Sequence, residues 1–364
     1  MTTAPISAAD RSQAGQAGDI VFVTDEISGL LPAHDTSVAL MEAAQLRGHR
    51  VLVTTAGELG FRDGAPTARC TPVTLRPAVL HDGKWIADRE WYAPGAAVCY
   101  PLNDAAAVFM RTDPPVDAGY LRATYLLDLV DPRRTLVVNS PAGVRNANEK
   151  LFALRAPELG PPTLVSADRQ EIRAAVAGWG RAVLKPTDWM GGRGVLILDP
   201  ADPNLCSLLD NATERGRSQV VVQQWIPAAS NGDRRVIVLD GEPVGVVRRV
   251  AGPGDFRCNM ATGALPVADA VTERDRAICA RLAPLLREQG LVFAGIDVIG
   301  GLLTEVNVTS PTGIREIDAL TGSHLAADVI AWAEANCPGA GRPTAGQDST
   351  SSVQRIRKTA GQAI

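Results

Sequence analysis

Short apolar runs alternate with amphipathic segments at the start of the chain. Residues 19–24 and 51–54 have the nearly unbroken apolar character of buried strands. The apolar positions between them follow a helical period, which predicts a helix from about residue 36 to 47 with Asp35 or Thr36 as its N-cap. This strand–helix–strand order predicts the beginning of a parallel α/β sheet.

The same alternation continues to residue 139. Strands are expected at residues 106–111 and 135–139 with a helix at 121–130 between them, and residues 71–91 suggest a peripheral hairpin. Residues 19–139 are therefore expected to form one Rossmann-like domain. No GxGxxG sequence follows its first strand, so dinucleotide binding is not supported.

The pattern changes at about residue 140, after which expected strands outnumber expected helices. Helices are expected from about 148–150, at 168–179 and at 273–289, and extended segments at 161–165, 182–185, 195–198, 219–226, 234–239 and 243–250. Two further apolar arms, residues 294–299 and 302–308, are joined by Gly300-Gly301 and predict a β-hairpin. Residues 1–18 and 337–364 are rich in small and polar residues, and we expect both to be disordered.

Polar residues interrupt both arms of the hairpin. Asp297 lies in the first arm, and Glu305 and Asn307 lie on one face of the second. Two carboxylates and an amide oxygen, without nearby His or Cys, suit a hard cation such as Mg²⁺. The alternative is the polar face of an antiparallel sheet, but carboxylates among apolar residues favour the metal site.

Lysine is rare in this chain, whose positive charge is almost all arginine. The 36 lysine and arginine residues include only these lysines: Lys84, Lys150, Lys185 and Lys358. Lys185 ends an apolar strand and Lys150 is expected to open a helix, and an ammonium group binds phosphate as a compact point charge. The loop Met190-Gly191-Gly192-Arg193-Gly194 joins two expected strands, and amides of such glycines can lie against phosphate oxygens. Together with the hairpin, these features predict a nucleoside triphosphate site.

Composition argues against several classes of function. The 364 residues carry a net charge of −4, so the chain lacks the basic surface typical of nucleic-acid binding. No apolar run is long enough to cross a membrane and residues 1–18 contain no apolar signal core, so a cytoplasmic protein is expected. The six cysteines have no CxxC spacing, which indicates neither a zinc site nor a disulfide framework.

These features lie within motifs that resemble the ATP-grasp ligases and, more closely, the bacterial glutathione synthetases. The matching segments follow one another in uninterrupted order: residues 110–115, 146–152, 185–192, 231–236, 240–244 and 305–312. The resemblance implies an α/β fold with an N-terminal Rossmann-like (pre-ATP-grasp) domain, residues 19–139, followed by a two-part ATP-grasp domain, residues 140–336. The lid would cover about 140–226 and the C-terminal part about 227–336.

The resemblance also implies roles for individual residues. The ATP phosphates would be held by Lys150, Lys185, Gly191 and Gly192, and adenine by the backbone of Gln223, Gln224, Trp225 and Ile226. The metal ion, Mg²⁺ or alternatively Mn²⁺, would be bound by Asp297, Glu305 and Asn307. Asp233 and Arg235 would act where ATP meets the substrate, with Arg235 and either Arg248 or Arg249 neutralising the substrate carboxylate. The remaining substrate-binding candidates are Ser37, Arg111, Asn259, Ser310 and Thr312.

The implied reaction is an ATP-dependent carboxylate–amine ligation through an acyl phosphate, with γ-glutamylcysteine and glycine as substrates and a homo-oligomer as the assembly. One segment departs from the family pattern, because Cys258 and Ala264 replace glycines in the loop that closes the acceptor pocket. Two alternatives therefore stay open: a specialised-metabolism ATP-grasp peptide ligase that joins a different carboxylate or amine, and an ATP-binding regulatory protein without turnover. The complete set of Asp297, Glu305 and Asn307 argues against the regulatory protein.

Overall fold

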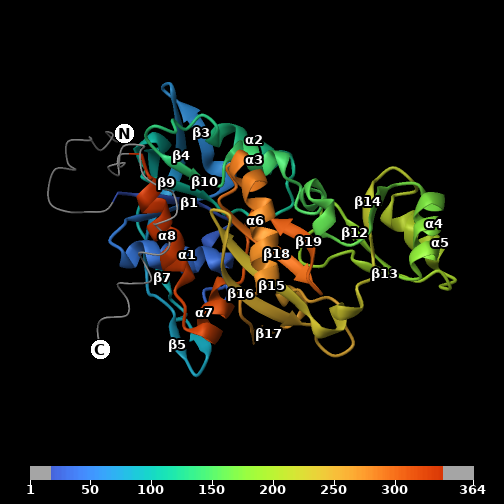
Figure 1. Ribbon diagram of the computed structural model, residues 1–364. Coiled ribbons are helices and arrows are strands. Elements are labelled where there is room, and N and C mark those ends of the chain that lie inside the picture. Colours follow the sequence, from blue (N-terminus) through green and yellow to red (C-terminus); the bar gives the residue numbers. More distant parts are fainter. Residues whose placement is uncertain (1–17, 339–364) are drawn as a thin grey trace.

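The computed structural model describes residues 18–338, and its N-terminal part is built on an eight-stranded sheet (Figure 1). The strand order is β10-β9-β1-β2-β4-β3, with β7 and β8 also paired to β4. The parallel strands are β1 (Ile20–Val23), β2 (Val51–Thr54), β9 (Ala107–Met110) and β10 (Leu136–Val138). The antiparallel strands are β3 (Leu59–Arg62), β4 (Ala65–Leu75), β7 (Tyr92–Pro94) and β8 (Val98–Pro101).

Two helices follow strands of this sheet, and each begins at an aspartate cap. Asp35 accepts from the N–H groups of Ser37 and Val38 at the start of α1 (Thr36–Leu46), and Asp117 caps α2 (Ala118–Leu127). The peripheral hairpin is also present, as β5 (Val79–His81) and β6 (Lys84–Ile86). The expected α/β order of this part is therefore confirmed.

Two antiparallel sheets follow. The lid sheet has the order β11-β14-β12-β13 and projects from the body with its helices (Figure 1). Its elements are β11 (Thr163–Ser166), α4 (Arg169–Trp179), β12 (Ala182–Pro186), β13 (Leu196–Leu198), α5 (Leu205–Ala212) and β14 (Val220–Gln224).

The C-terminal sheet has the order β17-β16-β15-β18-β19. Its strands are β15 (Asp233–Leu239), β16 (Glu242–Val250), β17 (Leu265–Ala268), β18 (Phe293–Ile299) and β19 (Leu302–Asn307). The helices of this part are α6 (Glu273–Glu288), α7 (Ile314–Thr321) and α8 (Leu325–Asn336). The expected hairpin is confirmed as β18 and β19, and both turn glycines have the positive φ that a tight hairpin turn requires.

The helix expected to open at Lys150 is absent. Residues 148–151 form a turn between α3 (Pro141–Asn146) and a 3₁₀ helix at Phe152–Arg155. The side-chain oxygen of Asn148 accepts from the N–H groups of Lys150 and Leu151, at 3.1 and 3.2 Å. Asparagine favours such local bonds over helical ones, so the prediction of a helix here was wrong.

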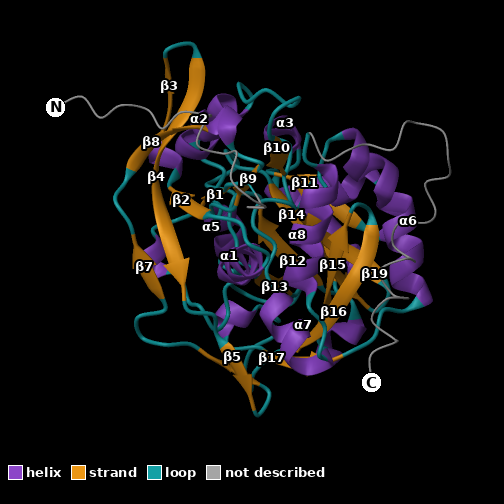
Figure 2. Ribbon diagram, turned by 90° about the vertical axis from the view of Figure 1, so that its left-hand side faces the viewer, coloured by secondary structure: helices purple, strands orange, loops and turns teal. Residues whose placement is uncertain are grey.

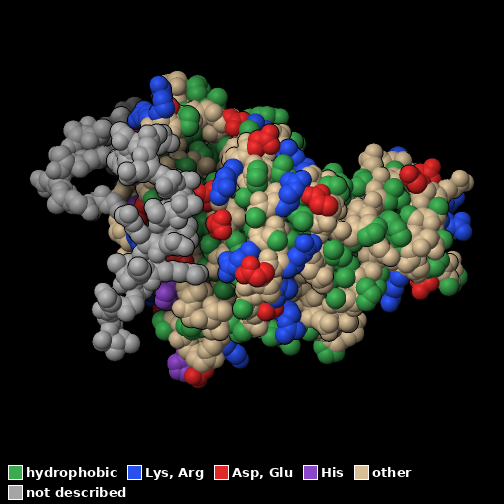
Figure 3. Space-filling model, viewed as in Figure 1, with side chains coloured by type: hydrophobic (Ala, Val, Ile, Leu, Met, Phe, Trp, Pro, Cys, Tyr) green, Lys and Arg blue, Asp and Glu red, His purple; other side chains and the backbone are tan. Residues whose placement is uncertain are grey.

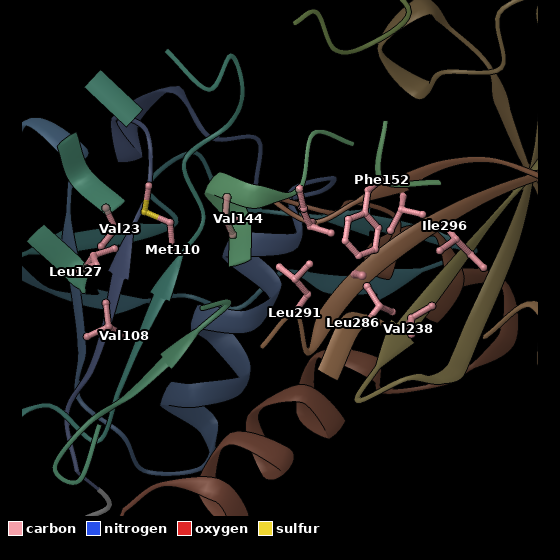
Figure 4. Close-up of a cluster of buried hydrophobic side chains, with 14 of the residues drawn as sticks. Val23, Val108, Met110, Leu127, Val144, Phe152, Val238, Leu286, Leu291 and Ile296 are labelled. Carbon is pink, nitrogen blue, oxygen red and sulfur yellow. The ribbon is translucent and has the colours of Figure 1, made fainter. Parts of the chain in front are cut away.

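Buried apolar side chains form three clusters in the described part of the chain. The largest joins the N-terminal sheet to the C-terminal sheet, from Val108 through Val144 to Phe152 and Ile296 (Figure 4). A second packs α1 against α7, α8 and the C-terminal sheet, between the two large sheets in Figure 2. The third lies wholly within the lid. Residues 141–159, which are expected to begin the lid, contribute apolar side chains to the largest cluster.

Charged side chains of both signs are interspersed over the face in Figure 3, in keeping with the small net charge. Among the residues described, no helix is long and apolar enough to span a membrane. The expectation of disordered termini concerns residues 1–17 and 339–364, which lie outside the described part of the chain.

Candidate active site

A cavity of about 1120 Å³ lies between the lid and the C-terminal sheet. Most residues expected at a nucleotide and substrate site line it, and they come from sequence positions far apart. These are Lys150, Lys185, Gly191, Gly192, Gln223, Gln224, Trp225, Ile226, Asp233, Arg235, Arg249, Asn259, Asp297, Glu305, Asn307, Ser310 and Thr312. The tertiary structure therefore gathers the predicted set, apart from Ser37 and Arg111, into one place.

The β18–β19 hairpin brings the three metal-ligand candidates together. Asp297 is paired in register with Glu305, and Asn307 is paired with Gly295. The Asn307 amide nitrogen donates to the Gly295 carbonyl at 3.2 Å and contacts Asp297 Oδ2 at 3.4 Å. The described residues contain no metal cluster made of three or more His, Cys, Asp or Glu side chains. The set of two carboxylates and one amide oxygen nevertheless suits a hard cation that keeps water or phosphate as further ligands.

Asp297 is at the centre of a buried charge network. Arg235 donates to both of its oxygens, at 2.6 and 3.1 Å, and Arg249 Nη2 lies 3.0 Å from Oδ1. Arg249 also donates to both oxygens of Asp233, at 2.7 and 2.6 Å. Such bidentate pairs fix the guanidinium planes, so the two arginines are held in place before any ligand arrives.

The two aspartates of this network have opposite pKa shifts. Burial acts to raise the pKa of Asp297, but Arg235 and Arg249 together hold it below its usual value. Burial raises the pKa of Asp233, Arg249 opposes this, and the negative charge of Asp297 adds to the rise. The network therefore keeps Asp297 ionised, with its negative charge next to the Glu305 carboxylate of the same hairpin.

Two lysines reach the hairpin from outside it. Lys150 Nζ donates to the Trp189 carbonyl at 2.5 Å and lies 3.5 Å from Glu305 Oε1. Lys185 Nζ, at the end of β12, lies 3.5 Å from the Thr304 carbonyl. Burial lowers the pKa of Lys185, although Glu305 and Asp297 oppose the shift. Two cations thus face the carboxylates across the cavity, where a polyphosphate would be attracted.

Glu149 is a functional candidate that sequence reasoning missed. Its Oε1 accepts from Val308 N, Thr309 N and Thr309 Oγ1, at 2.9, 3.1 and 2.8 Å. These bonds fix the chain immediately after Asn307. Its position next to Lys150 was the available signal, but its partners lie about 160 positions away, and this contact is not visible in the local pattern.

The glycine-rich loop, residues 190–194, meets the loop of residues 251–264, which we call the closing loop. Gly192 has φ +75°, and a Cβ there would lie 2.7 Å from Asn259 Oδ1. The closing loop also carries Phe256, whose ring meets Trp225 edge-on at 6.5 Å. Cys258 is buried in this loop and lines the cavity. The two loops together close this side of the cavity.

The adenine-strand candidates lie at the end of β14. Arg181 stacks over the Trp225 ring at 4.9 Å. The N–H groups of Gln224 and Trp225 donate to the carbonyls of Pro162 and Arg181, both at 2.9 Å. These two amides are therefore already engaged, which leaves other groups of this strand to bind a ligand.

Ser37 and Arg111 lie behind the wall of the cavity. Arg111 Nε donates to Ser37 Oγ at 3.1 Å, and its Nη2 donates to the Pro311 carbonyl at 3.0 Å. On the cavity side, Ser310 Oγ donates to Asp113 Oδ1, and Arg235 Nη1 donates to the Thr312 carbonyl at 3.2 Å. The 310–312 segment thus connects the Rossmann-like part to the charge network.

Two family models match most of the chain. The N-terminal domain of prokaryotic glutathione synthetase matches residues 19–145, and the ATP-grasp domain of prokaryotic glutathione synthetase matches residues 149–322. The chain is 54% identical over 314 residues to glutathione synthetase from Thermosynechococcus vestitus. This alignment covers 86% of this chain and 99% of the relative. It is 50% identical to glutathione synthetase from Nostoc sp., covering 87% and 98%.

Solved structures share the fold at lower sequence identity. D-cycloserine synthetase DcsG superposes with a TM-score of 0.60 at 18% identity, covering 88% of this chain and all of that one. At this identity the similarity concerns the fold alone.

Proposed function

Because the chain belongs to the prokaryotic glutathione synthetase family, we propose that it joins γ-glutamylcysteine to glycine while ATP is converted to ADP and phosphate. The protein is an ATP-grasp C–N ligase that acts on small molecules and uses ATP with a divalent cation. The observation that carries the proposal is that Lys150, Lys185, Glu305 and the Asp297 network meet in one cavity. Such a cavity can hold a polyphosphate next to a carboxylate.

The reaction follows from the poor leaving ability of a carboxylate oxygen. The cysteine carboxylate of γ-glutamylcysteine attacks the terminal phosphorus of ATP, which gives an acyl phosphate and ADP. The glycine amine then attacks the acyl carbon, the amide bond forms, and phosphate leaves. Phosphoryl transfer of this kind depends on positioning and charge stabilisation more than on a protein nucleophile.

We assign the phosphates to Lys150, Lys185 and the amides of Gly191 and Gly192. A cation held by Glu305, Asn307 and Asp297, Mg²⁺ or alternatively Mn²⁺, would supply Lewis-acid stabilisation of the phosphate oxygens. Adenine would lie along residues 223–226, bound through backbone groups other than the engaged N–H groups of Gln224 and Trp225.

Arg235 and Arg249 are assigned to the reacting carboxylate and the acyl phosphate. Both are buried and already oriented by Asp297 and Asp233, so little reorganisation accompanies charge development. Asp233 acts by holding Arg249. Asn259, Ser310 and Thr312 would border the acceptor amine, and the Rossmann-like part would hold the peptide.

The test is release of ADP that depends on Mg²⁺, with γ-glutamylcysteine and with or without glycine, and with products identified by mass. Release that requires both substrates and yields glutathione supports the proposal. Turnover with another amine or carboxylate, and none with these two, would overturn it.

One observation favours that second candidate, a ligase with a different acceptor. Cys258 places a buried thiol in the closing loop, at a position where the family resemblance leads us to expect glycine. A larger side chain there changes the shape of the pocket next to Asn259. A panel of amino acids and amines in the same assay separates the two candidates.

We also infer a homo-oligomer in the cytoplasm, on the basis of family membership. Light scattering after size exclusion would measure the assembly, and a monomer at working concentration would contradict it.

A further inference from the structure

The glycine-rich loop lies outside the strands and the apolar cluster of the lid, which projects from the body (Figure 1). Strand β12 ends at Pro186 and β13 begins at Leu196, and the cluster contains no residue of the segment between these strands. Gly191, Gly192 and Gly194 all have positive φ, and ordering a glycine costs more conformational entropy than ordering any other residue. The loop therefore depends on polar contacts with the rest of the molecule to hold one position.

The turn of residues 148–151 supplies such contacts from the body of the molecule. Asn148 Nδ2 donates to the Thr187 carbonyl at 3.1 Å, and Lys150 Nζ donates to the Trp189 carbonyl. Both carbonyls belong to the segment that leads from β12 into the glycine-rich loop. Two carbonyls of the lid, close together in the chain, are thus held by two side chains of one turn.

The turn itself is fixed in the body. Ala147 before it and Phe152 after it belong to the largest apolar cluster. The Asn148 carbonyl accepts from the N–H of Phe152 at 2.7 Å, and the Glu149 side chain binds the segment that follows β19. The two contacts with the lid therefore start from a support that is held by packing and by hydrogen bonds.

The hydrogen bonds of Asn148 show which of its side-chain atoms faces the lid. Its Oδ1 accepts from the N–H groups of Lys150 and Leu151. Because an amide nitrogen cannot accept these bonds, the nitrogen is the atom that faces the Thr187 carbonyl. Aspartate and serine also accept local bonds in such turns, but an ionised aspartate has no donor and the shorter serine does not reach the carbonyl. Asparagine therefore serves the turn with one atom and the lid with the other.

We propose that Asn148 is a positioning residue for the nucleotide phosphates. By holding the Thr187 carbonyl, it sets how far the amides of the glycine-rich loop lie from Lys150. Phosphate oxygens need these groups together, and groups that are held in place before binding lose less entropy when the nucleotide arrives. Asn148 is not among the residues that line the cavity, so it acts through the loop and not by touching the nucleotide. This assignment rests on the proposed function, which places the phosphates at this loop.

The same turn relates the glycine-rich loop to the β18–β19 hairpin. Lys150 Nζ lies 3.5 Å from Glu305 Oε1, and the Glu149 carbonyl accepts from the N–H of Val306 at 3.0 Å. A loop that moves away from the turn is thereby separated from Lys150 and from the hairpin at once. Loss of the Asn148 bond is therefore expected to weaken nucleotide binding, and to leave the reaction of the bound nucleotide nearly unchanged.

The experiment measures the dissociation constant of ADP by calorimetry in wild-type protein, Asn148→Asp and Asn148→Ser. ADP binding requires neither γ-glutamylcysteine nor turnover. Asn148→Asp keeps the acceptor of the turn and removes the donor to the lid, and Asn148→Ser does the same without adding a charge. Both variants are expected to raise the dissociation constant about 10-fold, the usual effect of losing one hydrogen bond whose partner stays in place.

Two further readouts separate a positioning role from a purely structural one. The value of kcat/KM for ATP should fall by the same factor, while kcat at saturating ATP stays nearly unchanged. Hydrogen exchange without nucleotide should be faster at residues 187–194 in both variants and unchanged in β15.

Asn146→Asp is the matched control. It makes the same change from amide to carboxylate two residues earlier, where the Asn146 amide donates to Gln289 Oε1 at 3.3 Å and does not line the cavity. An equal loss of ADP affinity in this control, or unchanged affinity in both Asn148 variants, would overturn the inference. Wild-type protein that binds ADP but forms no glutathione would contradict the proposed reaction and leave the role of Asn148 in place, whereas wild-type protein that does not bind ADP would overturn both.

Discussion

At the residue scale, the two lysines of the cavity are the clearest link between composition and site. We predict that Lys150→Met and Lys185→Met each lower kcat/KM for ATP by about 100-fold, the usual effect of removing one preorganised charge donor. ADP release over a range of ATP concentrations measures this. Lys84→Met is the control, because Lys84 is exposed on β6, and equal losses in all three variants would contradict the assignment.

Glu149 is expected to act through the metal-ligand hairpin. Glu149→Gln removes the negative charge of the carboxylate whose Oε1 accepts three hydrogen bonds next to Asn307, and supporting groups of this kind typically change metal affinity by about 10- to 100-fold. The expected result is a higher Mg²⁺ concentration for half-maximal activity, with a smaller change in the rate at saturating Mg²⁺. An unchanged Mg²⁺ dependence would mean that Glu149 only stabilises the fold.

At the element scale, contact between the glycine-rich loop and the closing loop can be tested with one methyl group. Gly192→Ala would place a Cβ against Asn259 and push the two loops apart, so kcat/KM is expected to fall by about 10-fold or more, since small misplacements in a site have large effects. Gly180→Ala is the control, because Gly180 has a similar φ of +77° but open space around it. Both variants carry backbone strain, and only the first should affect turnover.

The attachment of α8 to the segment between α1 and β2 should depend on pH. Glu334 accepts from Arg47, and its Oε1 lies 2.9 Å from His49 Nε2. The Arg47 bond lowers the pKa of Glu334, with His49 adding to the shift. The stabilisation is therefore present above the ordinary glutamate pKa of about 4.3 and is lost as pH falls through the lower folded-state pKa.

We accordingly predict that Glu334→Gln lowers the free energy of unfolding at pH 7 by about 0.5–1 kcal/mol, a value limited by solvent screening of this partly exposed pair. The difference from wild type should shrink as pH falls below the ordinary glutamate pKa and be lost once Glu334 is protonated in the folded state. Urea unfolding at several pH values measures it, and a difference that persists at low pH would contradict the ion-pair explanation.

At the scale of the whole molecule, the distribution of apolar clusters predicts how the protein opens. The largest cluster joins the two large sheets, whereas the cluster around Ile172, Leu184 and Val222 is confined to the lid. The lid is therefore expected to open as a unit of its own, and the remainder to unfold together.

Hydrogen exchange should show lower protection in residues 163–224 than in β15 and β18, and added ATP with Mg²⁺ should raise the protection of the lid. Equal protection of the lid and the C-terminal sheet without nucleotide would contradict this prediction.

The sequence by itself predicted most of the buried strands, the helices α1, α2, α4 and α6, and the identity of the chemical groups. It did not predict strands β3, β7, β8 and β17 or helices α3, α5, α7 and α8. Apolar periodicity and aspartate caps act over a few residues, so β1, α1 and the β18–β19 hairpin were predictable. Asp297, Glu305 and Asn307 were predictable as one set because the hairpin brings them together locally.

Only the tertiary structure decided which distant groups act on one another. Arg235 and Arg249 orient around Asp297 across neighbouring strands, Glu149 binds the chain after the end of β19, and Arg111 joins Ser37 to the Pro311 carbonyl. Lys150 lies in a turn, not in a helix, because Asn148 takes the local amides. Burial and long-range pairing depend on where segments pack in space, and no local pattern of residues carries that information.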